Sequence, residues 1–236
     1  MVEKSINLKK FGLPEKVSVF PIRFEYHIPK TRQAAENKSF IYFDLGEKHK
    51  ASVLTRKVED FCLPTLTGFD FDRSLSYSDT YDLAWKTLRE RGFTVVPTVR
   101  KVDDNTVATT NLSADEVTSV YDQKIDASEV RDTFPMDKEF VKIPRKMLQE
   151  EAENILYLAN KSGIELMPDG PFHIVVNADS SWYLMLLDIG KVRIYAKPRD
   201  LPSDAKKNNK FYLYSSVTAF TRIQMNIKAL RDARGF

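Results

Sequence analysis

The segment YLMLLDIGKVRIY, residues 183–195, constrains the fold of this chain more than any other. Its first five residues are apolar or aromatic without interruption, a pattern typical of a strand that is buried on both faces. The run ends at Asp188, which Ile189 and Gly190 follow. A carboxylate at the end of a buried strand is partly desolvated, which costs free energy unless a partner offsets it. Asp188 is therefore interpreted either as a cation-binding acid or as part of a simple turn.

The composition is that of an ordinary globular protein and excludes several classes of site. The chain has 236 residues, of which 42% are hydrophobic and 29% charged, so it can bury a sizeable core. Its net charge of +3 does not indicate a strong polyanion partner. A single cysteine, Cys62, excludes an intrachain disulfide and a cysteine-based zinc site. No apolar run approaches the roughly 18 residues that span a bilayer, and the N-terminal residues lack the apolar core of a signal peptide, so we expect a soluble cytoplasmic protein without a membrane partner.

The first half of the sequence predicts strands around one helix. Runs of β-branched and aromatic residues predict strands at 17–27, 39–45, 51–58, 93–102 and 105–112, the first three as an antiparallel meander. Pro21 confines the first of these to a sheet edge or a bulge. Residues 59–78 lack a steady period and predict a long connection. A helix is expected to begin at Ser78 or Asp79 and to end at Gly92, because apolar residues recur between them with helical spacing.

The second half predicts a linker, two helices and a hairpin. Residues 113–143 are polar and predict a linker with an irregular or short helical segment. Apolar periodicity predicts helices at 144–162 and 215–231. The strands FHIVVN, residues 172–177, and WYLMLL, residues 182–187, predict a hairpin. Residues 197–210 predict a polar, basic loop.

This order of elements resembles the protein-kinase-like fold, in particular the small-molecule phosphotransferases such as aminoglycoside and choline kinases. The resemblance is carried by AWKTLRERGFTVVPTVRKVDDNTVATTNL and by ILYLANKSGIELMPDGPFHIVVNADSSWYLMLLDIG. It implies a two-lobed α+β protein, with a small antiparallel-sheet N-terminal lobe at 1–112 and a linker region at 113–143. A mainly helical C-terminal lobe would occupy 144–236, and it is expected to be shortened because only 46 residues follow Gly190.

The resemblance also implies a site for ATP and magnesium. Asp188, in the DIG turn, takes the place of the family's magnesium-binding aspartate, and Asp169 that of the catalytic acid or base. Lys57 is the candidate for the lysine that holds the nucleotide phosphates, and Glu90 is a candidate for its helix carboxylate. Further candidate metal ligands on the hairpin are His173 and Asn177.

The chain departs from the family pattern at two motifs. Its eight glycines are scattered, so the glycine-rich phosphate loop is missing, and PKTRQAAENK stands in its place. No H-x-D motif precedes the hairpin. The sequence is therefore compatible with an active ATP-dependent phosphotransferase, which would act on an unknown small molecule or protein. The missing motifs point instead to an inactive relative, a pseudokinase that binds nucleotide or another protein.

A third hypothesis from another class is a nucleic-acid-binding or interaction protein unrelated to kinases. It rests on cations followed by the aromatic segment FYLY, residues 211–214; the cations are Lys197, Arg199, Lys206, Lys207 and Lys210. Aromatic rings beside cations suit single-stranded nucleic acid. The alternation in FYLY is also typical of a half-buried strand, and a basic loop is often only a solvated surface.

Overall fold

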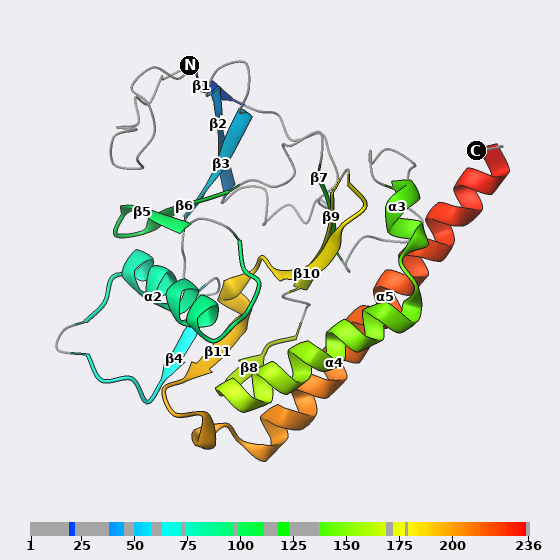
Figure 1. The fold of residues 1–236 in the computed structure, drawn as a ribbon. Helices are drawn as coiled ribbons and strands as arrows, with labels where there is room; N and C mark the ends of the chain where they lie inside the picture. The colour runs from blue at the N-terminus through cyan, green and yellow to red at the C-terminus, as the bar shows by residue number, and fades with distance from the viewer. Residues whose placement is uncertain are drawn as a thin grey trace.

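The computed structural model describes residues 19–21, 38–44, 50–57, 63–71, 74–96, 99–110, 118–122, 137–168, 172–177 and 179–234. Within these residues the chain forms a mixed α+β fold, with one five-stranded sheet, two three-stranded sheets and several helices (Figure 1). The described helices include none that is long and apolar enough to cross a membrane.

The five-stranded sheet is built from the N-terminal half of the chain. Its strands are β1 (Val19–Pro21), β2 (Lys38–Asp44), β3 (Lys50–Lys57), β5 (Val99–Asp103) and β6 (Thr106–Thr110). They lie in the order β1-β2-β3-β6-β5, and each pair is antiparallel. The predicted meander is thus confirmed, and Pro21 lies on an edge strand, where its missing N–H removes no hydrogen bond of the sheet interior.

The helix α2 (Tyr77–Glu90) packs against β5 and β6 and carries the predicted apolar face. Its N-cap is Ser76, so the prediction of Ser78 or Asp79 as the first cap was two to three residues late. Ser76 accepts a hydrogen bond from the backbone N–H of Asp79 at 3.1 Å, which satisfies one of the free donors of the first turn. Gly92, at φ +89°, follows the helix as expected.

The hairpin of β9 (Phe172–Asn177) and β10 (Trp182–Leu186) forms as predicted. On its other edge β9 pairs with β7 (Thr118–Asp122), which the sequence reading had placed in the polar linker. The short helix α3 (Asp137–Lys142) matches the short helical segment expected there. The expectation of a linker at 113–143 therefore missed one strand, since five residues with a single valine and a single tyrosine show no clear period.

The third sheet joins three short strands that are far apart in the sequence. They are β4 (Thr65–Thr67), β8 (Ile164–Leu166) and β11 (Val192–Tyr195), with β11 in the middle, parallel to β4 and antiparallel to β8. The segment 59–78, expected to be a connection, thus contributes β4. Between β10 and β11 the chain makes the 3-10 turn η4 (Ile189–Lys191).

Two long helices cover one side of the molecule, side by side (Figure 1). The first, α4 (Arg145–Ser162), agrees with prediction and ends at Gly163 in the left-handed conformation. The second, α5 (Ser203–Arg234), has 32 residues, so the expected basic loop at 197–210 and the expected start at 215 were wrong. Only the short 3-10 turn η5 (Pro198–Asp200) and its flanks lie before α5, and the FYLY segment is helical and does not form a strand.

One hydrophobic cluster extends through most of the described elements. It runs from Tyr81 in α2 to Ile227 in α5 and includes Val107 in β6 and Ile174 in β9. Arg91, the residue after α2, links this helix to the end of α4 and to the chain after β11, because its guanidinium donates to the Ser162 and Ala196 carbonyls. The described helices and the strands from β5 onward therefore share one core.

Candidate functional site

Asp188 lies just after β10, where the chain turns from that strand into η4. The strand residues before it are deeply buried, with Leu186 0% exposed, and Ile189 directly after it is also 0% exposed. The Asp188 side chain itself keeps 29% of its surface exposed. Buried neighbours on both sides thus fix the backbone of Asp188 while its carboxylate reaches solvent.

The surroundings of Asp188 come from segments distant in sequence. The backbone N–H of Leu186 donates to the Thr94 carbonyl at 2.8 Å, and Val95 bridges to Leu186 as a parallel strand pair. The helix α2 packs on η4 as well as on the five-stranded sheet. Asp188 is therefore placed where α2 and the chain that follows it meet the end of β10.

One cation of the protein lies near the Asp188 carboxylate. Lys191 Nζ is 3.9 Å from Asp188 Oδ2, at the outer limit of an ion pair, and about a quarter of the Lys191 side chain is exposed. Among the described residues, no group of three or more His, Cys, Asp and Glu side chains could hold a metal ion. A hard cation at Asp188 would then depend on oxygen ligands from outside this set, such as phosphate oxygens and water, which is the coordination that magnesium commonly takes.

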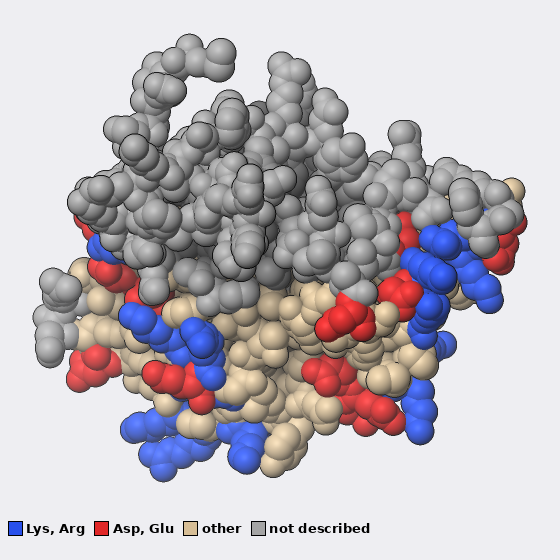
Figure 2. Space-filling model, turned by 45° about the horizontal axis from the view of Figure 1, so that its top comes forward, with Lys and Arg blue, Asp and Glu red and all other residues tan. Residues whose placement is uncertain are grey.

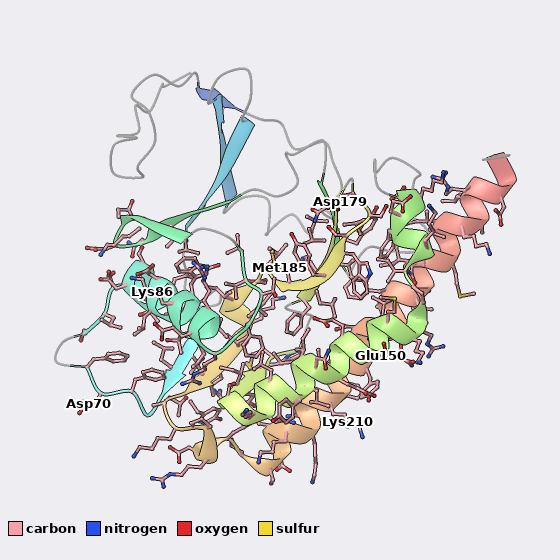
Figure 3. All side chains as sticks on the ribbon, viewed as in Figure 1. Asp70, Lys86, Glu150, Asp179, Met185 and Lys210 are labelled. Carbon is pink, nitrogen blue, oxygen red and sulfur yellow. The ribbon has the colours of Figure 1, made fainter. Side chains whose placement is uncertain are left out.

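His173 is on the same hairpin and lies in the interior of the sheet. It is paired with Met185 of β10 on one side and with Asp122 of β7 on the other. Its Nδ1 atom is buried. Figure 3 labels Met185, which lies near the centre of the view, between the N-terminal sheet and the long helices. Met185, the residue paired with His173, precedes Asp188 by three residues in the chain.

Asn177 lies at the opposite end of the hairpin from Asp188. Its N–H donates to the Ser181 carbonyl at 2.9 Å and its side-chain amide donates to Ser181 Oγ at 2.8 Å. Five residues separate Ser181 from Leu186, so Asn177 is roughly 17 Å from the Asp188 end at about 3.3 Å per residue. The structure does not bring Asn177 and Asp188 together.

Lys57 and Glu90 lie near opposite ends of α2. Lys57 is the last residue of β3 and its Cα is paired with Thr106 at the β5–β6 turn. The N-terminus of α2 is next to that turn, because the N–H of Ser78 donates to the Asp104 carbonyl at 3.0 Å. Glu90 is exposed at the other end of the helix, about 20 Å away at 1.5 Å per residue. Asp169 lies outside the described residues.

A second surface feature was not expected in this form. A hollow of about 580 Å³ runs along α5, and side chains of that helix line it, among them Lys207, Lys210, Phe211, Tyr214, Thr218 and Arg222. These positions recur every three to four residues, so a search for helical spacing across 207–222 would have found one face. Sequence reasoning missed it because the polar segment was assigned to a loop.

Comparison with known proteins gives a distant structural likeness. No family model and no curated protein matches the chain. Among solved structures, the chain is similar to the Rio2 kinase of Chaetomium thermophilum, crystallised as its ADP/Mg²⁺-phosphoaspartate complex, with a TM-score of 0.39 and 14% sequence identity. The match covers 92% of this chain and 57% of that one, so this chain spans well under two thirds of the kinase chain. A likeness of this size assigns no family, activity or ligand to the present chain.

Proposed function

We propose that this protein is a kinase-like nucleotide-binding protein in which Asp188 holds a magnesium ion on the phosphates of ATP. The observation that carries the proposal is the position of Asp188, a partly exposed carboxylate between the fully buried Leu186 and Ile189. An acid with a fixed backbone and a partly exposed carboxylate is pre-organised for a cation.

The donor set at Asp188 is compatible with magnesium. Magnesium is usually bound by one or two carboxylates together with phosphate oxygens and waters, and it does not require a cage of protein ligands. Lys191, 3.9 Å from Asp188, balances the carboxylate charge before the cation arrives. With the cation in place, this ammonium group is close enough to the site to attract phosphate oxygens.

We also propose that the chain has two lobes, at 1–112 and 144–236, joined by a linker region at 113–143. Within the kinase-like proteins we place it in the aminoglycoside and choline kinase branch. In this proposal, Lys57 contacts the nucleotide phosphates and Asp169 orients an acceptor hydroxyl of a small molecule or a protein. His173 is a nearby metal-ligand candidate, although imidazole suits magnesium poorly. Glu90 and Asn177 are the weakest members, because the described backbone separates Glu90 from Lys57 and Asn177 from Asp188.

The test is the thermal stability of the protein with ATP and MgCl₂. A ligand that binds the native state at 100 times its Kd stabilises by about 2.7 kcal/mol, so millimolar ATP with magnesium raises Tm measurably. Asp188→Asn keeps the size of the side chain and removes its charge, so the magnesium-dependent part of the shift is lost. Asp179→Asn is the matched control at the other end of the hairpin, where Asp179 is exposed and accepts from Ser181, and it keeps the full shift.

Two outcomes would overturn the proposal: no shift at 5 mM nucleotide, or an equal shift in wild type and Asp188→Asn. Transfer of the γ-phosphoryl group of labelled ATP then separates an active enzyme from an inactive relative. In an active enzyme, Asp169→Asn abolishes transfer and leaves the ATP-dependent Tm shift in place.

A further inference from the structure

The outer face of α5 carries cations and aromatic rings in one row, in which Ser215 and Thr218 separate the rings from the last cation. Phe211 is 67% exposed, an unusual exposure for so large an apolar side chain. Lys207 and Lys210 lie toward the start of the row and Arg222 toward its end, and all line the same hollow. From Lys207 to Arg222 the helix advances about 22 Å at 1.5 Å per residue.

Tyr214 is held in place at the middle of this row. Its hydroxyl donates to Glu153 Oε1 of α4 at 3.1 Å, and Lys210 Nζ lies 5.9 Å from the centroid of its ring. Figure 3 shows Lys210 at the outer edge of the molecule beside α5 and Glu150 on the adjacent helix α4. The row therefore offers a ring with a fixed orientation next to a cation.

Positive charge is concentrated on α5. The helix has seven Lys and Arg residues and two Asp residues, a net charge of +5, and the whole chain has +3, so the other residues together carry −2. On the face shown in Figure 2, basic and acidic side chains of the described residues lie next to each other. The helix that presents the exposed ring of Phe211 thus also carries excess positive charge, which favours an anionic partner.

A second copy of this chain fits the face poorly. In an isologous antiparallel pairing of two α5 helices centred near Tyr214, Lys207 of one copy would lie opposite Arg222 of the other. Like charges directly opposite each other are destabilising. An anion with flat rings of its own matches both features of the row, because it neutralises the cations and stacks on the aromatic side chains.

We propose that the outer face of α5, from Lys207 to Arg222, binds single-stranded nucleic acid. The cations contact backbone phosphates, and Phe211 and Tyr214 stack against bases. Of the five cations that suggested such a partner from sequence, only Lys207 and Lys210 line the hollow, and Arg222 replaces the others. This face is separate from Asp188, so the inference is independent of the proposed nucleotide site.

The test is fluorescence anisotropy with a labelled 20-nucleotide oligo(dT) strand between 50 and 300 mM salt. For single strands the slope of log K against log salt is about −0.7 per phosphate contact, so replacing Lys207, Lys210 and Arg222 together by Ala makes the slope about two units shallower. Phe211→Ala weakens binding about five- to a hundredfold and leaves the slope unchanged, because it removes stacking without removing charge. Glu153→Gln keeps an acceptor for Tyr214 and removes a negative charge at the rim, so the strand binds more tightly.

Matched controls come from α4 and α2. Tyr157→Ala removes a ring that is 65% exposed on α4, and Lys86, Lys146 and Lys161 together provide three exposed cations that do not line the hollow. These controls leave affinity and slope close to wild type, and thermal unfolding checks that each variant is folded. Failure to bind oligo(dT) at 50 mM salt would overturn the proposal. Equal effects of the control and test variants, or equal affinity for a duplex of the same length, would also overturn it. Competition by a 20-residue poly-glutamate peptide as strong as that by unlabelled oligo(dT) would overturn it as well and would indicate a protein partner.

Discussion

Asn209 joins α5 to β8 and α4 through one buried amide. It is 0% exposed, its Nδ2 donates to the Ile164 carbonyl at 2.8 Å and to Asn160 Oδ1 at 3.1 Å, and its Oδ1 accepts from the N–H of Leu166 at 2.7 Å. Two of these partners are backbone groups at the ends of a three-residue strand. The amide therefore completes the hydrogen bonding of β8, which has no neighbour on that side in the described sheet.

We expect Asn209→Ala to lower the free energy of unfolding by about 2–4 kcal/mol, because it leaves a buried N–H and a buried carbonyl without their partner. Asn208→Ala, one residue earlier and exposed, should change it by less than about 0.5 kcal/mol. Urea denaturation measures both. A similar loss in the two variants would show that the amide bonds of Asn209 do not stabilise β8.

Gly163 is the second residue whose local geometry has a clear consequence. It has φ +70°, and a Cβ built there would lie 2.7 Å from the Pro198 Cα. Gly92 has φ +89°, but a Cβ there would meet only Leu158 side-chain atoms at 3.8 Å. We expect Gly92→Ala to cost about 1 kcal/mol of stability for the left-handed backbone, and Gly163→Ala about 3 kcal/mol because a backbone clash is added. Equal Tm losses for the two variants would contradict the role of Pro198.

At the scale of elements, the cap of α2 predicts a pH dependence. The Ser76 hydroxyl donates to Asp79 Oδ2 at 2.7 Å and Lys101 Nζ lies 3.1 Å from the same oxygen, and together they lower the pKa of Asp79 below its ordinary value. A carboxyl whose pKa is lowered by folding stabilises the protein above its unfolded pKa of about 3.9 and loses that effect as pH falls through the folded pKa. More than a third of the Asp79 side chain is exposed, so the effect is small, about 0.5 kcal/mol.

Ser76→Ala should therefore destabilise by about 1 kcal/mol at neutral pH, through loss of the cap, and should raise the pKa of Asp79 toward its ordinary value. Asp79→Asn should be less stable than wild type by a constant amount between pH 7 and 5, and the difference should shrink below about pH 4. NMR titration of the Asp79 carboxyl and unfolding at each pH measure these effects. An unchanged pKa in Ser76→Ala would assign the shift to Lys101 alone.

Elements with strong end signals could be predicted, and elements held by distant partners could not. For α4 and α2, apolar side chains at helical spacing and a following glycine gave bounds within two residues. The start of α5 was missed because SDAKKNNK has one apolar residue, and the burial of Asn209 depends on β8, 45 residues away. The strands β4 and β8 have three residues each, too few to show alternation, and β4 pairs with β11 more than 120 residues later.

For the candidate site too, local sequence patterns could be interpreted and contacts between distant segments could not. Asp188 could be proposed from sequence because its own strand and turn single it out, and its role stays a prediction. The separation of Glu90 from Lys57 depends on the direction of α2 over the sheet, which the sequence does not contain. The face of α5 was hidden by an error in secondary structure. The sequence shows the cations and rings near residue 210, but only the helix places Arg222 with Lys207 and Lys210 in one hollow.

At the scale of the whole molecule, the shared core predicts cooperative unfolding, and the two tryptophans can report on it. Trp85 lies in α2, is 6% exposed and donates from Nε1 to the Val96 carbonyl at 2.8 Å. Trp182 begins β10 and packs, partly buried, against the same cluster. Because that cluster continues from α2 to α5, loss of packing at one tryptophan should remove contacts at the other.

We expect Trp85→Phe and Trp182→Phe, each with one remaining tryptophan, to unfold in a single transition in urea. Trp85→Phe should have the lower midpoint, since it leaves the Val96 carbonyl without its donor. In each variant the fluorescence midpoint of the remaining tryptophan should coincide with the midpoint from far-UV circular dichroism. If Trp85 reported an earlier transition than circular dichroism in Trp182→Phe, α2 and the N-terminal sheet would unfold independently of α4 and α5. The continuous cluster would then be two cores in contact.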